Sequence, residues 1–141
     1  MSIKITQPAL STQVVDPGLG WPVLNVADFI QFAQLPDAVD AASMVEVLNL
    51  GVSDVLIWVA VRDLLVVPLS SAELIWFKLS VHYQSLAHLM VRLPVSWQVK
   101  SSPQAIHDLS DRQEWYFEQA KSAVRRIGGA QTPGAANSRL L

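Results

Sequence analysis

A run of apolar residues between Ser70 and Pro94 constrains the fold more than any other feature of the sequence. Within it, large side chains recur at alternating steps of three and four residues, at Trp76, Leu79, Tyr83, Leu86, Met90 and Leu93. That spacing places them on one face of an α-helix, as a seam for packing against other helices. Ser70 and Glu73 have the spacing of a capping box that begins the helix, and Pro94 ends it. Further apolar residues beside the seam predict a helix buried on more than one side, within the domain or within an assembly.

Two helices are predicted before this one. Asn25 caps a short helix that reaches about Gln34. A second helix covers about 40–65, because apolar residues from Val45 to Val59 repeat with the helical period. The same period places Arg62 and Asp63 on its exposed side. Gly51 is a point where this helix kinks or splits, since glycine costs about 1 kcal/mol in a helix interior.

A closing helix is predicted to begin at Ser110, after a loop over 94–109. Gln113 completes a second capping box, and the glycine pair at 128–129 stops the helix. Its inner face is marked by Phe117, Ala120, Val124 and Ile127, and Trp115 on the same helix is a candidate for core packing or for anchoring an interface. The fold class predicted is therefore all-α, a bundle of about four helices.

The two ends of the chain lack the helical pattern of the residues between them. Residues 1–24 contain three prolines and a turn signal at 16–18, which predict an extended N-terminal arm, with Trp21 as its apolar anchor. Residues 130–141 are mostly small and polar, which predicts a flexible C-terminal tail that docks through Arg139, Leu140 and Leu141. The helical domain is assigned to 25–129.

Composition narrows the classes of function. Of the 141 residues, 51% are hydrophobic and 16% charged, against roughly 25% charged in average soluble domains. No apolar stretch reaches the roughly 18 residues of a membrane span, so we expect the excess apolar surface to lie in subunit interfaces. The chain has no cysteine, which excludes disulfides, thiol catalysis and cysteine-based zinc sites. Residues 1–70 hold two basic and seven acidic residues, whereas 71–141 hold eight and five. These halves carry charges of −5 and +3, which suit ordinary solvated surface or contact between neighbouring subunits.

No residue pattern in the sequence predicts catalysis. Walker, dinucleotide-binding, zincin and nucleophile-elbow motifs are missing. His82 and His88 are six residues apart on one predicted helix, which does not direct both to one metal ion. His107 stands close to Asp108 and Asp111, where helix capping and solvation explain these residues more simply than catalysis does. We expect a protein that is not an enzyme and needs no cofactor.

Two stretches of the chain resemble the head-completion, or head–tail connector, proteins of tailed bacteriophages. One is the aromatic-rich stretch from Ile75 to Met90. The other runs from Asp111 to Gly129, passing from the acid-flanked aromatics at 115–117 to a basic end that closes with Ile127 and Gly128. The similar region, from Ser70 to Gly129, covers about 60 of the 141 residues. The proline-rich arm and Pro94 depart from the family's pattern.

The resemblance implies a structural virion protein at the head–tail junction, made in the host cytoplasm. Such a subunit forms a homo-oligomeric ring, dodecameric in this family, that docks beneath the portal protein. The ring extends the DNA channel, through which DNA passes without sequence recognition, and offers a surface to tail or neck proteins. Three alternatives remain open: another neck or tail-completion subunit, a helical regulatory module that binds a partner, and a small enzyme built around His107.

Overall fold

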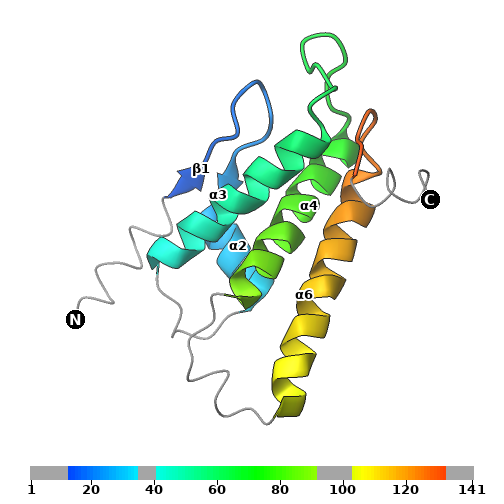
Figure 1. Cartoon of the computed structure of the whole chain (residues 1–141). Helices are drawn as coiled ribbons and strands as arrows, with labels where there is room; N and C mark the ends of the chain where they lie inside the picture. Colours follow the sequence, from blue (N-terminus) through cyan, green and yellow to red (C-terminus); the bar gives the residue numbers. More distant parts are fainter. Residues whose placement is uncertain (1–12, 35–40, 92–102, 133–141) are drawn as a thin grey trace, which may run out of the picture.

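The computed structural model describes residues 13–34, 41–91 and 103–132, with the side chains of 41 and 103–109 left out of the description. It confirms the predicted all-α fold class. The helices are α2 (Val26–Ala33), α3 (Ala41–Trp58), α4 (Ser71–Met90) and α6 (Pro103–Val124), and the strands are β1 (Val14–Val15) and β2 (Leu24–Asn25). Figure 1 shows α3, α4 and α6 running side by side, with alternating directions, and the small hairpin lying against α3.

The described part of the N-terminal arm folds back onto the bundle. β1 and β2 pair antiparallel, with Val14 opposite Asn25 and Val15 opposite Leu24. The turn between them has left-handed backbone at Gly18 (φ +78°), Leu19 (+56°) and Gly20 (+86°), a conformation that glycine adopts without steric cost. This turn brings Trp21 onto Phe77 of α4, with ring centroids 4.9 Å apart, so Trp21 anchors this segment. Residues 1–12 of the arm lie outside the described residues.

Asn25 begins α2, as predicted, although its side chain donates to the Asp28 carboxylate at 3.3 Å instead of accepting from the backbone. The predicted capping box of α4 is confirmed: Ser70 Oγ accepts from Glu73 N at 3.1 Å, and Glu73 Oε1 accepts from Ser70 N at 3.0 Å. These bonds satisfy two backbone N–H groups that the first helical turn cannot pair internally.

The second predicted helix is too long by half a dozen residues. α3 ends at Trp58, and 59–70 form turns and a loop that lead into α4. Arg62 was also placed wrongly: its side chain is only 8% exposed and forms an ion pair with Glu73. The helical period overestimated the length of this helix, because it treats the aliphatic residues around 61–67 as one helical face. In the structure the Arg62 side chain points inward to its hydrogen-bond partners, and the chain turns there.

α6 begins at Pro103, so the predicted loop over 94–109 extends too far and the predicted start at Ser110 is too late. Gln113 therefore lies inside the helix, where its Nε2 donates to Ala87 O of α4 at 3.1 Å instead of forming a cap. Proline has no backbone N–H, but an N–H at the first helical position would have no partner within the helix. Proline therefore loses no hydrogen bond there, which suits it to begin a helix. The helix ends at Val124, a turn before the glycine pair. Residues 94–102 lie outside the described residues.

Gly51 neither kinks nor splits α3, which continues through it. A Cβ at this position would lie 2.1 Å from Ser85 Oγ, 2.9 Å from Val81 O and 3.0 Å from Ser85 N of α4. Two of those atoms belong to the backbone, so they move only if the helices move. Gly51 is therefore the place where α3 and α4 approach closely.

We predict that Gly51→Ala destabilises the fold by about 2 kcal/mol, although alanine favours helix by roughly 1 kcal/mol over glycine. The midpoint of urea denaturation, followed by circular dichroism, measures this. Ser53→Ala, on an exposed side of the same helix, is the matched control and should change stability by about 0.5 kcal/mol or less. Equal stability of wild type and Gly51→Ala would contradict the close approach.

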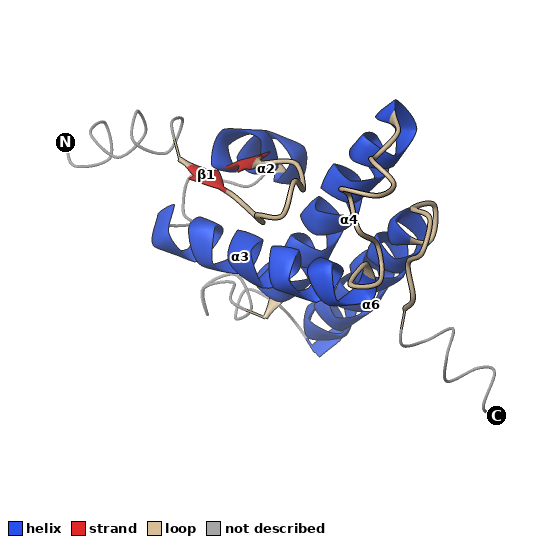
Figure 2. Cartoon of the chain, turned by 90° about the horizontal axis from the view of Figure 1, so that it is seen from above, coloured by secondary structure: helices blue, strands red, loops and turns tan. Residues whose placement is uncertain are grey.

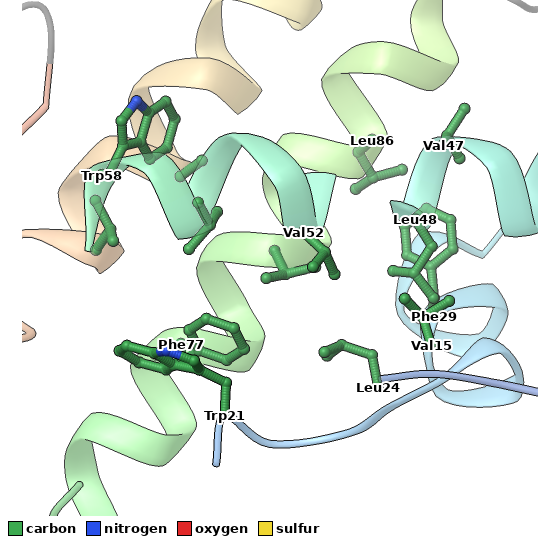
Figure 3. Packing of buried hydrophobic residues seen from close by; sticks show 14 of the residues in the cluster. Val15, Trp21, Leu24, Phe29, Val47, Leu48, Val52, Trp58, Phe77 and Leu86 are labelled. Carbon is green, nitrogen blue, oxygen red and sulfur yellow. The ribbon is translucent and has the colours of Figure 1, made fainter. Parts of the chain in front are cut away.

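The core joins the hairpin to the four helices of the described residues. Its fully buried large side chains are Leu24, Val26, Phe29, Val47, Leu48, Val55, Val59, Phe77, Val81, Leu89, Val124 and Ile127. Figure 3 shows Trp21 and Leu24 from the hairpin facing the side chains of α3 and α4. The connection between α3 and α4 lies at one end of the bundle (Figure 1).

Candidate interaction surface

Large aliphatic side chains are exposed at the end of the bundle where α3 passes into α4. They are Ile57, Val61, Leu65, Val66 and Val67, which together we call the apolar loop patch. Val61 is 71% exposed and Leu65 94% exposed. Monomeric soluble proteins rarely gather large apolar residues on one surface, and where they do, the surface commonly binds a protein or a membrane.

An apolar pocket of about 1010 Å³ lies beside this patch. One wall is the hairpin turn, with Leu19, Gly20, Trp21 and Pro22. The other walls come from the end of α3, the connection and the first turn of α4. Their apolar side chains are Leu56, Val59, Leu64, Leu65, Leu69 and Leu74. Arg62 and Asp63 are the charged residues of the lining. Leu65 belongs to both the pocket and the patch.

The connection is held in shape by Arg62. Its Nη1 and Nη2 donate to the two Glu73 carboxylate oxygens, each at 2.9 Å. The same guanidinium donates to Val67 O, Pro68 O and Gly128 O at 2.8–3.0 Å. Such paired, charge-assisted bonds are among the stronger side-chain interactions. Arg62 thus ties the connection to the start of α4 and to the turn after α6.

The contacts between Arg62 and Glu73 favour the charged form of each side chain. The hydrogen bond from Arg62 holds the pKa of Glu73 well below its usual range, and the backbone N–H groups of Gly128 and Ser70 lower it further. The hydrogen bond to Glu73 likewise raises the pKa of Arg62. Because Glu73 satisfies the Arg62 charge, the uncompensated charge that the pocket presents is the Asp63 carboxylate.

The predicted seam of α4 faces the bundle, but the most deeply buried positions lie beside it. Leu86 is buried, whereas Trp76, Tyr83 and Met90 are partly buried against the core and Leu79 is half-buried. The fully buried residues Phe77, Val81 and Leu89 form the centre of the packing face instead. Leu93 lies outside the described residues. The Arg126 guanidinium covers the Trp76 ring at 4.4 Å from its centroid.

The residues singled out on the closing helix are divided between core and surface. Ala120, Val124 and Ile127 are buried, and Phe117 is half-buried, with its ring nearly perpendicular to that of His88. Trp115 is 52% exposed and touches Tyr83 and Tyr116. Arg139, Leu140 and Leu141 lie outside the described residues.

The histidines of α4 belong to two different environments. His88 Nε2 lies 2.6 Å from Asp54 Oδ2, which also accepts from Gln84 Nε2 at 2.8 Å, so these groups link α3 to α4. His82 packs between Phe29 and Phe32, and burial lowers its pKa to about 4. Within 13–34, 41–91 and 103–132 no group of three or more His, Asp or Glu side chains could hold a metal ion. The side chain of His107 is outside the description.

Sequence reasoning missed the pocket and the patch. A helix through 65 would have spread the aliphatic residues of 59–69 over its sides, whereas the observed turns collect them at one end. The available signal was the aliphatic run before Pro68, where Leu64, Leu65, Val66 and Val67 are consecutive and follow no amphipathic period. Residues 18–20, with two glycines, gave a second signal for the turn that walls the pocket.

Comparison with models of known protein families, with curated proteins and with solved structures finds no match to this chain. In the part of the chain that the structure describes, no helix is both long enough and apolar enough to cross a membrane.

Proposed function

We propose that this protein is a structural assembly subunit that binds neighbouring protein through the apolar loop patch, and that its role is that of a head–tail connector of a tailed bacteriophage. The observation that carries the assembly role is the exposure of five large aliphatic side chains at one end of the bundle, one in the last turn of α3 and four on the connection that follows. The connector role is the finer proposal, and it rests on the resemblance of the stretches 75–90 and 111–129.

Charge favours a protein partner for the patch over a lipid surface. Segments that bind at a membrane interface commonly carry lysine or arginine around their apolar residues. The one cation within 57–67 is Arg62, whose charge is paired with Glu73. Asp63 leaves the connection with an acidic character, which suits contact with a basic protein surface.

In the connector role, copies of the chain form a ring that docks beneath the portal protein and extends the DNA channel. The ring would then present its other side to tail or neck proteins, and DNA would pass without sequence recognition. Arg139, Leu140 and Leu141 are the proposed docking residues of the tail. The location tests this role directly: antibody against the chain should label the junction of head and tail in intact virions, and labelling elsewhere would contradict it.

Assembly is tested by Val61→Asp. The substitution removes a valine that the proposed contact would bury and places a charge in that apolar contact, which should weaken association at least about tenfold. Native mass spectrometry and sedimentation velocity over a range of concentrations measure this. The wild type should form one discrete oligomer, and Val61→Asp should be mainly monomeric with unchanged helix content, since Val61 is largely exposed in the single chain.

Val91→Asp is the matched control, because Val91 is also a largely exposed valine but follows α4 at the opposite end of the bundle. It should leave the oligomer intact. A wild-type chain that stays monomeric at every concentration and does not join a larger complex would contradict the assembly role.

A further inference from the structure

We propose that the apolar pocket receives residues 133–141 of a second copy of this chain, with Leu140 and Leu141 between its apolar walls and Arg139 on Asp63. This inference rests on the proposed assembly function and names the contact that would join neighbouring copies. It is carried by the chemistry of the pocket, by the point at which the described chain ends and by the sequence that follows it.

The pocket has the chemistry that these three residues require. Its apolar walls include six leucines and Trp21, which suit aliphatic side chains. Asp63 lies at the pocket and is exposed, and its Oδ1 accepts from Leu65 N at 2.9 Å, which sets the direction of the carboxylate. Because Arg62 is already paired with Glu73, Asp63 is the charge that attracts an incoming guanidinium.

The described chain ends close to the same end of the bundle. Gln131 N donates to Trp58 O at 2.8 Å, and Arg125 Nε donates to Thr132 Oγ1 at 3.2 Å. Thr132 is therefore held beside the end of α3. The nine residues that follow can span up to about 30 Å when extended. That length suffices to enter a neighbouring molecule.

The pocket and Thr132, the last described residue, lie on different sides of this end of the bundle. In Figure 1 the hairpin turn that walls the pocket is on one side of the α3–α4 connection, and residues 125–132 are on the other side. Figure 2, which views this end from above, shows the same order. When a molecule carries a site and its complement on different sides, copies join head to tail, and such a heterologous contact closes into a ring or continues as a filament.

Cysteine trapping tests this contact, because the natural chain contains no cysteine. Full-length Leu65→Cys chain is mixed with full-length Leu141→Cys chain under mild oxidation. We expect a cross-linked dimer of the two variants to form at least about tenfold faster than with Val91→Cys as the pocket-side partner. Both Leu65 and Val91 are exposed, so they should be similarly reactive, and their positions at opposite ends distinguish specific docking from random collision.

Charge reversal tests the role of Asp63. Adding Arg139→Asp to the Leu141→Cys chain should slow cross-linking about fivefold, and adding Asp63→Arg to the Leu65→Cys chain should do the same. Combining the two should restore the rate to within about twofold of the original pair. A combined rate as slow as either single reversal would overturn the pairing of Arg139 with Asp63.

A chain that carries both Leu65→Cys and Leu141→Cys distinguishes a second copy from the same chain. Docking between copies should give a ladder of cross-linked oligomers. An intramolecular cross-link in a monomer, or a rate no faster than the Val91→Cys control, would overturn the proposal. If wild type still forms an oligomer that Val61→Asp dissociates, the proposed assembly role survives that failure. If the cross-link forms between copies but Val61→Asp leaves the assembly unchanged, the apolar loop patch has been misassigned.

Discussion

Replacing Arg62 by alanine is expected to lower the free energy of unfolding by about 3 kcal/mol or more. The substitution leaves the Glu73 carboxylate, whose side chain is only 17% exposed, without its cation. Removing one partner of a buried ion pair commonly costs about 3–5 kcal/mol, because the remaining charge has lost both water and its counter-ion. Three backbone carbonyls that accept from the guanidinium lose a donor as well. Urea denaturation followed by circular dichroism measures the change.

A surface ion pair provides the control for this experiment. Lys121 Nζ lies 3.4 Å from Glu118 Oε1 on α6, and the Glu118 side chain is mostly exposed. Lys121→Ala should therefore change stability by about 0.5 kcal/mol or less. Similar losses for Arg62→Ala and Lys121→Ala would mean that the Arg62 contacts do not hold the connection.

The same ion pair makes stability depend on pH. Because the pKa of Glu73 is depressed in the folded chain, its contribution is present above the unfolded-state pKa of about 4.3 and is lost as the pH falls below it. His82 adds a separate loss, since its pKa of about 4 in the folded chain lies below the unfolded value of about 6.5. As the pH falls from about 6.5 to 4, the unfolded chain binds a proton at His82 that the folded chain does not yet bind. The free energy of unfolding therefore declines over this range. Glu73→Gln should remove the loss below about pH 4.3 and keep the one above it.

Phe77→Ala is expected to be comparably damaging, with a loss of about 3–5 kcal/mol. Phe77 is fully buried in α4 and stacks on Trp21, as Figure 3 shows. Truncating a buried phenylalanine removes its transfer free energy and leaves a cavity. The loss should also loosen the hairpin, because Trp21 loses the surface on which it stacks. Thermal and urea denaturation measure the global effect, and amide exchange of residues 14–25 measures the local one.

Ile75→Ala is the matched control for Phe77→Ala. Ile75 lies two residues away on the same helix, but its side chain is largely exposed. Its truncation should cost less than about 1 kcal/mol. A loss of under 1 kcal/mol for Phe77→Ala would show that the hairpin and α4 do not share one core.

Individual helices were predicted well where local signals and packing agree. Ser70, Glu73 and the apolar period after them predicted α4, because a capping box acts within four residues and needs no distant partner. The end of the second helix was mispredicted, because the turn after Trp58 depends on Arg62 reaching Glu73 and Gly128. These partners lie 11 and 66 residues away in sequence, and no local pattern encodes contacts of that separation.

The candidate surface likewise depends partly on local sequence signals and partly on contacts between distant residues. The sequence by itself determined that the chain is helical, that it is rich in apolar residues and that Trp21 would anchor the N-terminal segment, since these follow from period, composition and turn chemistry. Only the tertiary structure decided where the excess apolar residues gather. The inward ion pair of Arg62 ends α3 early and exposes Leu65 and its neighbours, while the left-handed turn at 18–20 places a second wall beside them. A surface built from segments some forty residues apart exists only after the chain has folded.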